Sequence, residues 1–94
     1  MEIEKIKPGM LAWSRAGHDK GNLYMILRVA DDCVFLADGK QRTVENPKKK
    51  KIKHVQLMYH IPRELKTVDI NHIKNEEIKY ALKCHLKSEL CSGG

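Results

Sequence analysis

The stretch "AGHDKGNLYMILRV", residues 16–29, joins a glycine turn that carries a lysine to a run of residues that are almost all apolar. Residues 23–29 have too little polar interruption for a strand with one face in water, so we expect both faces to be covered. A strand of this kind is typical of the centre of a small closed sheet. In the turn before it, Gly17 and Gly21 allow left-handed backbone, and Lys20 adds a charge between them.

Turn signals divide the rest of residues 1–62 in the same way. Asp38 and Gly39 form a hairpin-type signal, and Pro47 ends the short strand that follows them. The strands are expected at residues 10–15, 23–29, 33–37, 42–45 and 54–58. Five short strands with tight turns predict a mainly β protein, built as a small five-stranded barrel rather than as an α/β fold.

Beyond Pro62 the sequence takes on a helical period. Asn75 can cap a helix, glutamates occupy the next two positions, and Ile78, Leu82 and Leu86 then repeat at every fourth residue. This pattern predicts an α-helix over residues 76–88. We therefore expect two parts, a barrel at residues 1–62 and a C-terminal helical extension at residues 63–94.

Length and composition indicate the class of protein. A chain of 94 residues makes one domain with a small core. Its N-terminus is charged and lacks the apolar region of a signal peptide, and three cysteines without paired spacing are typical of reduced thiols. The longest apolar run is far shorter than the roughly 20 residues of a membrane span. These features predict a cytoplasmic protein with no membrane association.

Positive charge is concentrated in the middle of the chain. Residues 39–62 carry 7 basic and 1 acidic side chains, a balance of +6, which equals the net charge of the whole protein. Most of these cations belong to the stretch "NPKKKKIKH", residues 46–54. A crowded lysine run is usually a solvated loop, but here apolar strands bracket it. A rigid cationic segment of this kind favours a polyanionic partner.

Residues 9–29 resemble the KOW motif, a short sequence found in SH3-like barrels of ribosomal proteins and transcription-elongation factors. The resemblance is carried by Gly9, Gly17, Lys20, Gly21, Ile26 and Val29. Many KOW motifs have a further glycine where this chain has Tyr24. Over residues 6–58 the chain is similar to the L14e-like family of large-subunit ribosomal proteins, and over its whole length to KOW-domain RNA-binding proteins of Gram-positive anaerobic bacteria.

This resemblance implies an SH3-like barrel that binds structured RNA, such as ribosomal RNA, through the glycine turn and a basic loop. The residues that it assigns to RNA binding are Gly17, Lys20, Gly21, Arg42, Lys48, Lys49, Lys50, Lys51, Lys53 and His54. Arg15 and His18 flank the turn, so we expect them to bind RNA as its neighbours. Lysines outnumber arginines among them, which favours contact with the phosphate backbone and recognition of shape over reading of bases.

Two alternatives remain open at this level. The apolar helix face could bind a protein partner, such as another ribosomal protein, which would make the chain a protein-interaction module. The same face could instead cover an open end of the barrel. Trp13 is expected to pack beneath the helix, with stacking on a base as the second interpretation.

The sequence contains no motif for enzymatic chemistry, a cofactor or a metal. It lacks a nucleophile motif and a phosphate loop of the Walker type. His72, Cys84, His85 and Cys91 have metal-binding side chains, but no paired spacing groups them. We therefore expect a non-catalytic protein without a cofactor or a metal.

Overall fold

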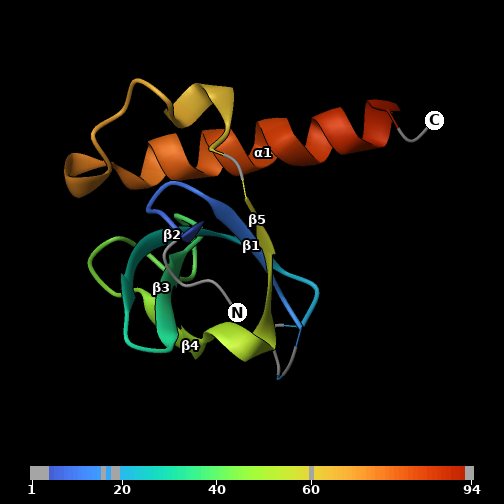
Figure 1. The fold of residues 1–94 in the computed structure, drawn as a ribbon. Helices are drawn as coiled ribbons and strands as arrows, with labels where there is room; N and C mark the ends of the chain where they lie inside the picture. Colours follow the sequence, from blue (N-terminus) through green and yellow to red (C-terminus); the bar gives the residue numbers. More distant parts are fainter. Residues whose placement is uncertain (1–4, 16, 18–19, 60, 93–94) are drawn as a thin grey trace.

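The computed structural model describes residues 5–15, 17, 20–59 and 61–92, which form a strand-rich body with a helix across it (Figure 1). The elements are β1 (Leu11–Ser14), β2 (Leu23–Ala30), β3 (Cys33–Ala37), β4 (Lys48–Lys51), the 3-10 helix η2 (Ile52–His54), β5 (Val55–Met58), the 3-10 helices η3 (Arg63–Leu65) and η4 (Ile70–His72), and α1 (Asn75–Ser92). The fold is mainly β with a C-terminal helix, as predicted.

The strands form one antiparallel sheet in the order β4-β3-β2-β1-β5. β4 and β5 are therefore its two edges, although only the three residues of η2 join them in sequence. So short a connection requires the sheet to curl, as Figure 1 shows. Over the described residues the sheet is not closed between β4 and β5. The expected barrel is thus confirmed only as a curled five-stranded sheet.

The central strand, β2, has both faces covered along its first half. Tyr24 and Ile26 belong to a core cluster that draws on every strand except β4, whereas Leu23 and Met25 belong to a second cluster that includes α1. The pairing with β3 shifts register after Ile26, and from Arg28 onward alternate residues of β2 are exposed. The prediction of a fully covered strand therefore holds only before the bulge.

The prediction of a strand at residues 42–45 is wrong. Residues 38–46 form a loop, and the fourth strand is the lysine run itself. In the loop, the Oδ1 atom of Asp38 accepts hydrogen bonds from the backbone N–H groups of Lys40 and Arg42, both at 2.9 Å. These two backbone N–H groups are then not available to pair with a neighbouring strand, and the chain folds into a compact turn. Arg42 therefore lies in this loop and not on the fourth strand.

The helix α1 includes the predicted residues 76–88 and continues to Ser92. At its start, the Glu77 carboxylate accepts a hydrogen bond of 2.9 Å from the backbone N–H of Lys74, as in a capping box. The expected cap, Asn75, makes a tertiary contact: its Oδ1 atom accepts from the backbone N–H of Val44 at 2.9 Å, and its amide nitrogen donates to Glu45. These bonds attach the start of α1 to the 38–46 loop.

The inner face of α1 completes the second core cluster. Ile78, Ala81 and Leu82 are buried there, and Trp13 packs against the same cluster, which confirms its expected place. The cluster also contains Leu65, so segments on both sides of residue 62 contribute to it. Within the described part of the chain, no helix combines the length and the hydropathy that crossing a membrane requires.

Candidate nucleic-acid interface

The lysine run forms an edge strand rather than a basic loop. Along β4, Lys49 and Lys51 are exposed, whereas Lys48 and Lys50 are half-buried. Pairing with β3 explains this alternation, because Lys48 and Lys50 lie opposite Leu36 and Val34, which face the core. Long lysine stems can lie along apolar surface while their ammonium groups reach water. β4 therefore presents cations on both faces of one sheet edge.

The 3-10 helix η2 carries the positive charge from β4 toward the end of β1. Ile52 is 2% exposed and anchors η2 in the core, while Lys53 and His54 are exposed. The backbone carbonyl of His54 accepts a hydrogen bond of 2.9 Å from the N–H of Arg15. We call this continuous surface the basic edge, and it consists of Arg15, Lys48, Lys49, Lys50, Lys51, Lys53 and His54.

The glycine turn, residues 17–21, begins two residues after Arg15 of the basic edge. Gly17 and Gly21 have φ angles of 84° and 90°, which confirms the left-handed backbone expected at both positions. The carbonyl of Gly17 accepts from the N–H of Lys20 at 3.2 Å, and Gly21 donates to Ser14 at 2.8 Å. No described atom lies within 4 Å of a Cβ built on Gly21, so another molecule can approach the backbone there.

The structure brings the predicted turn and the predicted lysines to one side of the molecule. In Figure 1, β4 and η2 lie at the bottom of the view, whereas α1 crosses the top. The exposed Lys20 and Gly17 follow the basic edge through Arg15. His18 lies outside the described residues. Arg42 is separate from this group, because its loop is bonded through Val44 to the start of α1.

Arg28 is a cation beside this surface that sequence reasoning missed. Its guanidinium carbon lies 4.1 Å from the centre of the Phe35 ring. This distance is typical of a cation–π contact, which fixes a side chain that would otherwise be mobile. Phe35 is also the register partner of Lys49, so Arg28 lies on the face of the sheet that displays Lys49. The sequence did contain a sign of this site, because Arg28 is the one charged residue within the apolar residues 23–29.

Asp32 of the β2–β3 turn opposes the positive charge at the end of β4. Its backbone carbonyl accepts from the N–H of Ile52 at 2.8 Å, and its carboxylate accepts from the Cys33 thiol at 3.3 Å. The thiol hydrogen bond, backbone bonding and the charges of Lys51 and Lys49 lower the pKa of Asp32. The carboxylate therefore stays negative and reduces the positive potential near Lys51.

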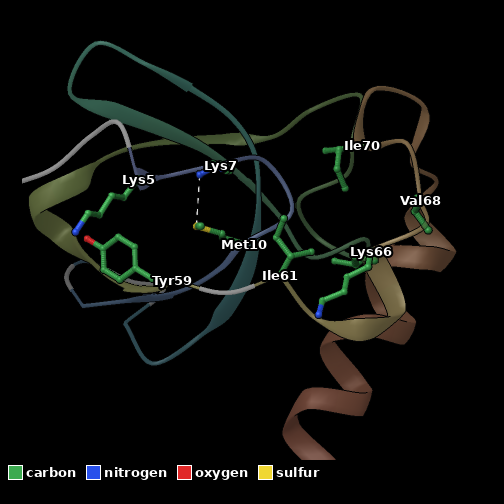
Figure 2. Close-up of a pocket in the computed structure, with 9 residues that line it drawn as sticks. Lys5, Lys7, Met10, Tyr59, Ile61, Lys66, Val68 and Ile70 are labelled. Carbon is green, nitrogen blue, oxygen red and sulfur yellow. Dashed lines mark hydrogen bonds between the residues drawn. The ribbon is translucent and has the colours of Figure 1, made fainter.

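A separate hollow of about 710 Å³ lies between the segment before β1, the end of β5 and residues 61–70 (Figure 2). Apolar side chains such as Met10 and Ile61 line it, and Lys5 and Lys66 stand on opposite sides. Tyr59 beside Lys5 is 55% exposed. The residues predicted to bind RNA do not line this hollow, so it is distinct from the basic edge.

The described side chains do not offer a metal centre, because no three of their histidine, cysteine, aspartate or glutamate groups gather at one place. The exposed His72 instead contacts the Asp69 carboxylate through its Nδ1 atom at 2.8 Å. That hydrogen bond, together with one from the backbone of Asn71, lowers the pKa of Asp69. No protein-family model matches the chain, and no curated protein matches it in sequence.

Proposed function

We propose that the protein is a non-catalytic RNA-binding protein that holds structured RNA, such as ribosomal RNA, on its basic edge and glycine turn. The observation that carries this proposal is the hydrogen bond between Arg15 and His54, because it joins the lysine strand to the turn. In this proposal the curled sheet is an SH3-like barrel of the KOW type, and the protein acts in the cytoplasm in association with the ribosome or translation.

The chemistry of the basic edge favours contact with phosphates. Lys49 and Lys51 project on the same face of β4, about 6.6 Å apart along the strand, so each ammonium can meet a different phosphate. Lysine is a point charge without the planar fork that reads a base edge. Binding is therefore expected to depend on the shape and charge of the RNA and little on its sequence.

Lysines on an edge strand also have a structural use, because they prevent other strands from adding to the sheet. Protection of the sheet edge requires charged residues only on the edge strand itself. Here the positive charge continues past β4 into Lys53 and His54 of η2 and reaches Arg15 on a different strand. This continuation supports a binding surface rather than edge protection alone.

The test compares two double variants that change the net charge equally. Lys49→Ala/Lys51→Ala removes exposed cations from the basic edge, whereas Lys66→Ala/Lys74→Ala removes exposed cations from the segment before α1. Fluorescence anisotropy with a labelled RNA hairpin measures Kd for each protein. We expect the first variant to bind about fifteenfold to twenty-fivefold more weakly at roughly 0.15 M salt, because each lost phosphate contact costs about fourfold to fivefold.

The control variant is expected to keep the Kd of the unaltered protein within about twofold, because its lysines lie away from the basic edge. Circular dichroism spectra of all three proteins check that the fold is kept. Equal weakening by both variants would show that net charge, and not the basic edge, attracts the RNA. Equal affinity of all three proteins would refute the proposed surface.

A further inference from the structure

A second cationic surface runs along α1, at the opposite end of the molecule from β4 (Figure 1). It is a groove of about 970 Å³ between one face of the helix and the residues around Asn22 and Asp38. Its wall on α1 extends from Lys79 to Lys87, a length of about 12 Å along the helix axis. A groove of this length accommodates two turns of a second helix.

The rim of the groove is positive. Lys79, Lys83 and Lys87 recur at every fourth residue of α1, and Lys40 faces them from the 38–46 loop. Among the described residues that line the groove, Asp38 supplies the one carboxylate, and its Oδ1 atom already accepts two backbone hydrogen bonds within its own loop. The described lining therefore carries four lysines against one carboxylate.

The floor of the groove is apolar and partly open. Leu23 and Leu82 are buried at its base, while Leu86 and Tyr80 are 41% and 62% exposed. Burial of Ile78 and Leu82 accounts for the inner face of α1, which covers the second core cluster. Leu86 lies beyond that cluster, so covering the core does not explain its place on the helix.

We propose that this groove binds an acidic amphipathic helix of a partner protein, with its aliphatic side chains on Leu86 and its carboxylates on the lysine row. Charge complementarity selects an acidic partner. The floor favours a peptide over RNA, because Leu23, Leu82 and Leu86 offer aliphatic contacts, and Tyr80 is the single aromatic ring in the lining, whereas RNA strands bind to a series of stacking rings. The surface is distinct from the basic edge and goes beyond the proposed RNA binding.

The test uses a fluorescein-labelled peptide with leucines at positions i, i+4 and i+7 and glutamates between them. Its binding to the intact protein is compared with that of Lys83→Glu/Lys87→Glu, of Lys66→Glu/Lys74→Glu with the same change in charge, and of Lys49→Ala/Lys51→Ala. We expect the first variant to bind at least about tenfold more weakly. The other two are expected to keep the affinity of the unaltered protein, and amide signals of Leu23, Leu82 and Leu86 are expected to shift with the peptide.

Three results would overturn this proposal. The first is equal peptide affinity for the unaltered protein and Lys83→Glu/Lys87→Glu. The second is a loss of RNA-hairpin affinity in Lys83→Glu/Lys87→Glu as large as that in Lys49→Ala/Lys51→Ala, because the groove would then belong to the RNA surface. The third is a dimer in sedimentation that the groove variant dissociates, because the occupant would then be a second copy of the chain. RNA and peptide are measured separately, so either proposal can fail alone.

Discussion

Gly39 is a point of close approach between the 38–46 loop and α1. Its φ angle is +80°, and a Cβ there would collide with the backbone oxygen of Asn75 and lie 2.8 Å from Cγ of Lys79. Gly39→Ala is therefore expected to combine backbone strain with a steric clash. We expect a loss of about 2 to 4 kcal/mol in the free energy of unfolding, measured by urea denaturation.

Gly21 offers a matched control for this prediction, because its φ angle of +90° is similar but its surroundings are open. Gly21→Ala carries the strain alone and is expected to cost about 1 to 2 kcal/mol. A loss of stability in Gly39→Ala no greater than that in Gly21→Ala would contradict the view that α1 leaves no room for a side chain at position 39.

Cys33 is a thiol whose ionisation is controlled by its neighbours. Burial raises the pKa of Cys33 above its ordinary 9.0, and the hydrogen bond to Asp32 and the charge of that carboxylate raise it further. Asp32→Asn removes the charge, so the Cys33 pKa is expected to fall, although burial keeps it above the ordinary value. The rate of alkylation by iodoacetamide at a given alkaline pH should then rise.

The measurement is best made with Cys84→Ala/Cys91→Ala as the background, which leaves Cys33 as the single thiol. Alkylation rates over a pH series then give the Cys33 pKa with and without Asp32→Asn. An unchanged alkylation profile would mean that burial alone determines the pKa. Far-ultraviolet circular dichroism of both proteins excludes loss of the fold as the cause of faster alkylation.

At the scale of elements, α1 is part of the core along one face and open along another. Ile78 is fully buried in the second cluster, whereas Leu86 is 41% exposed. Ile78→Ala is therefore expected to lower the free energy of unfolding by about 2 to 4 kcal/mol. Leu86→Ala is expected to cost less than about 1 kcal/mol. Urea denaturation of both variants measures the difference, and similar losses would contradict this division of the helix.

The strands that sequence predicts best are those with a strong apolar signal. β2 and β3 were expected at residues 23–29 and 33–37, and the structure has them at Leu23–Ala30 and Cys33–Ala37, because each is a short apolar run bounded by turn residues. β4 was not predicted, since four lysines have low strand propensity and resemble a solvated loop. Pairing with β3 decides the conformation of β4. One neighbouring strand and one half-buried face are enough for this strand, because its long side chains still reach water.

At the scale of the whole molecule, the sequence identified the cations but not how the fold divides them. Residues 39–62 carry the excess charge as a single block. The fold places Lys40 beside α1 and holds Arg42 in the 38–46 loop, whereas the lysines of β4 lie on the opposite edge strand. That division depends on tertiary hydrogen bonds such as Val44 to Asn75, which no local pattern encodes.

This division predicts how RNA affinity responds to salt. With about six phosphate contacts, the logarithm of the binding constant should fall against the logarithm of salt concentration with a slope of about −4 to −5. Lys49→Ala/Lys51→Ala is expected to reduce the steepness by about 1.5, because each phosphate contact contributes roughly 0.7 to 0.9. Lys66→Ala/Lys74→Ala should leave it unchanged. Anisotropy titrations at several salt concentrations give the three slopes. A flat slope, or equal reductions in both variants, would mean that RNA does not bind through phosphates on the basic edge.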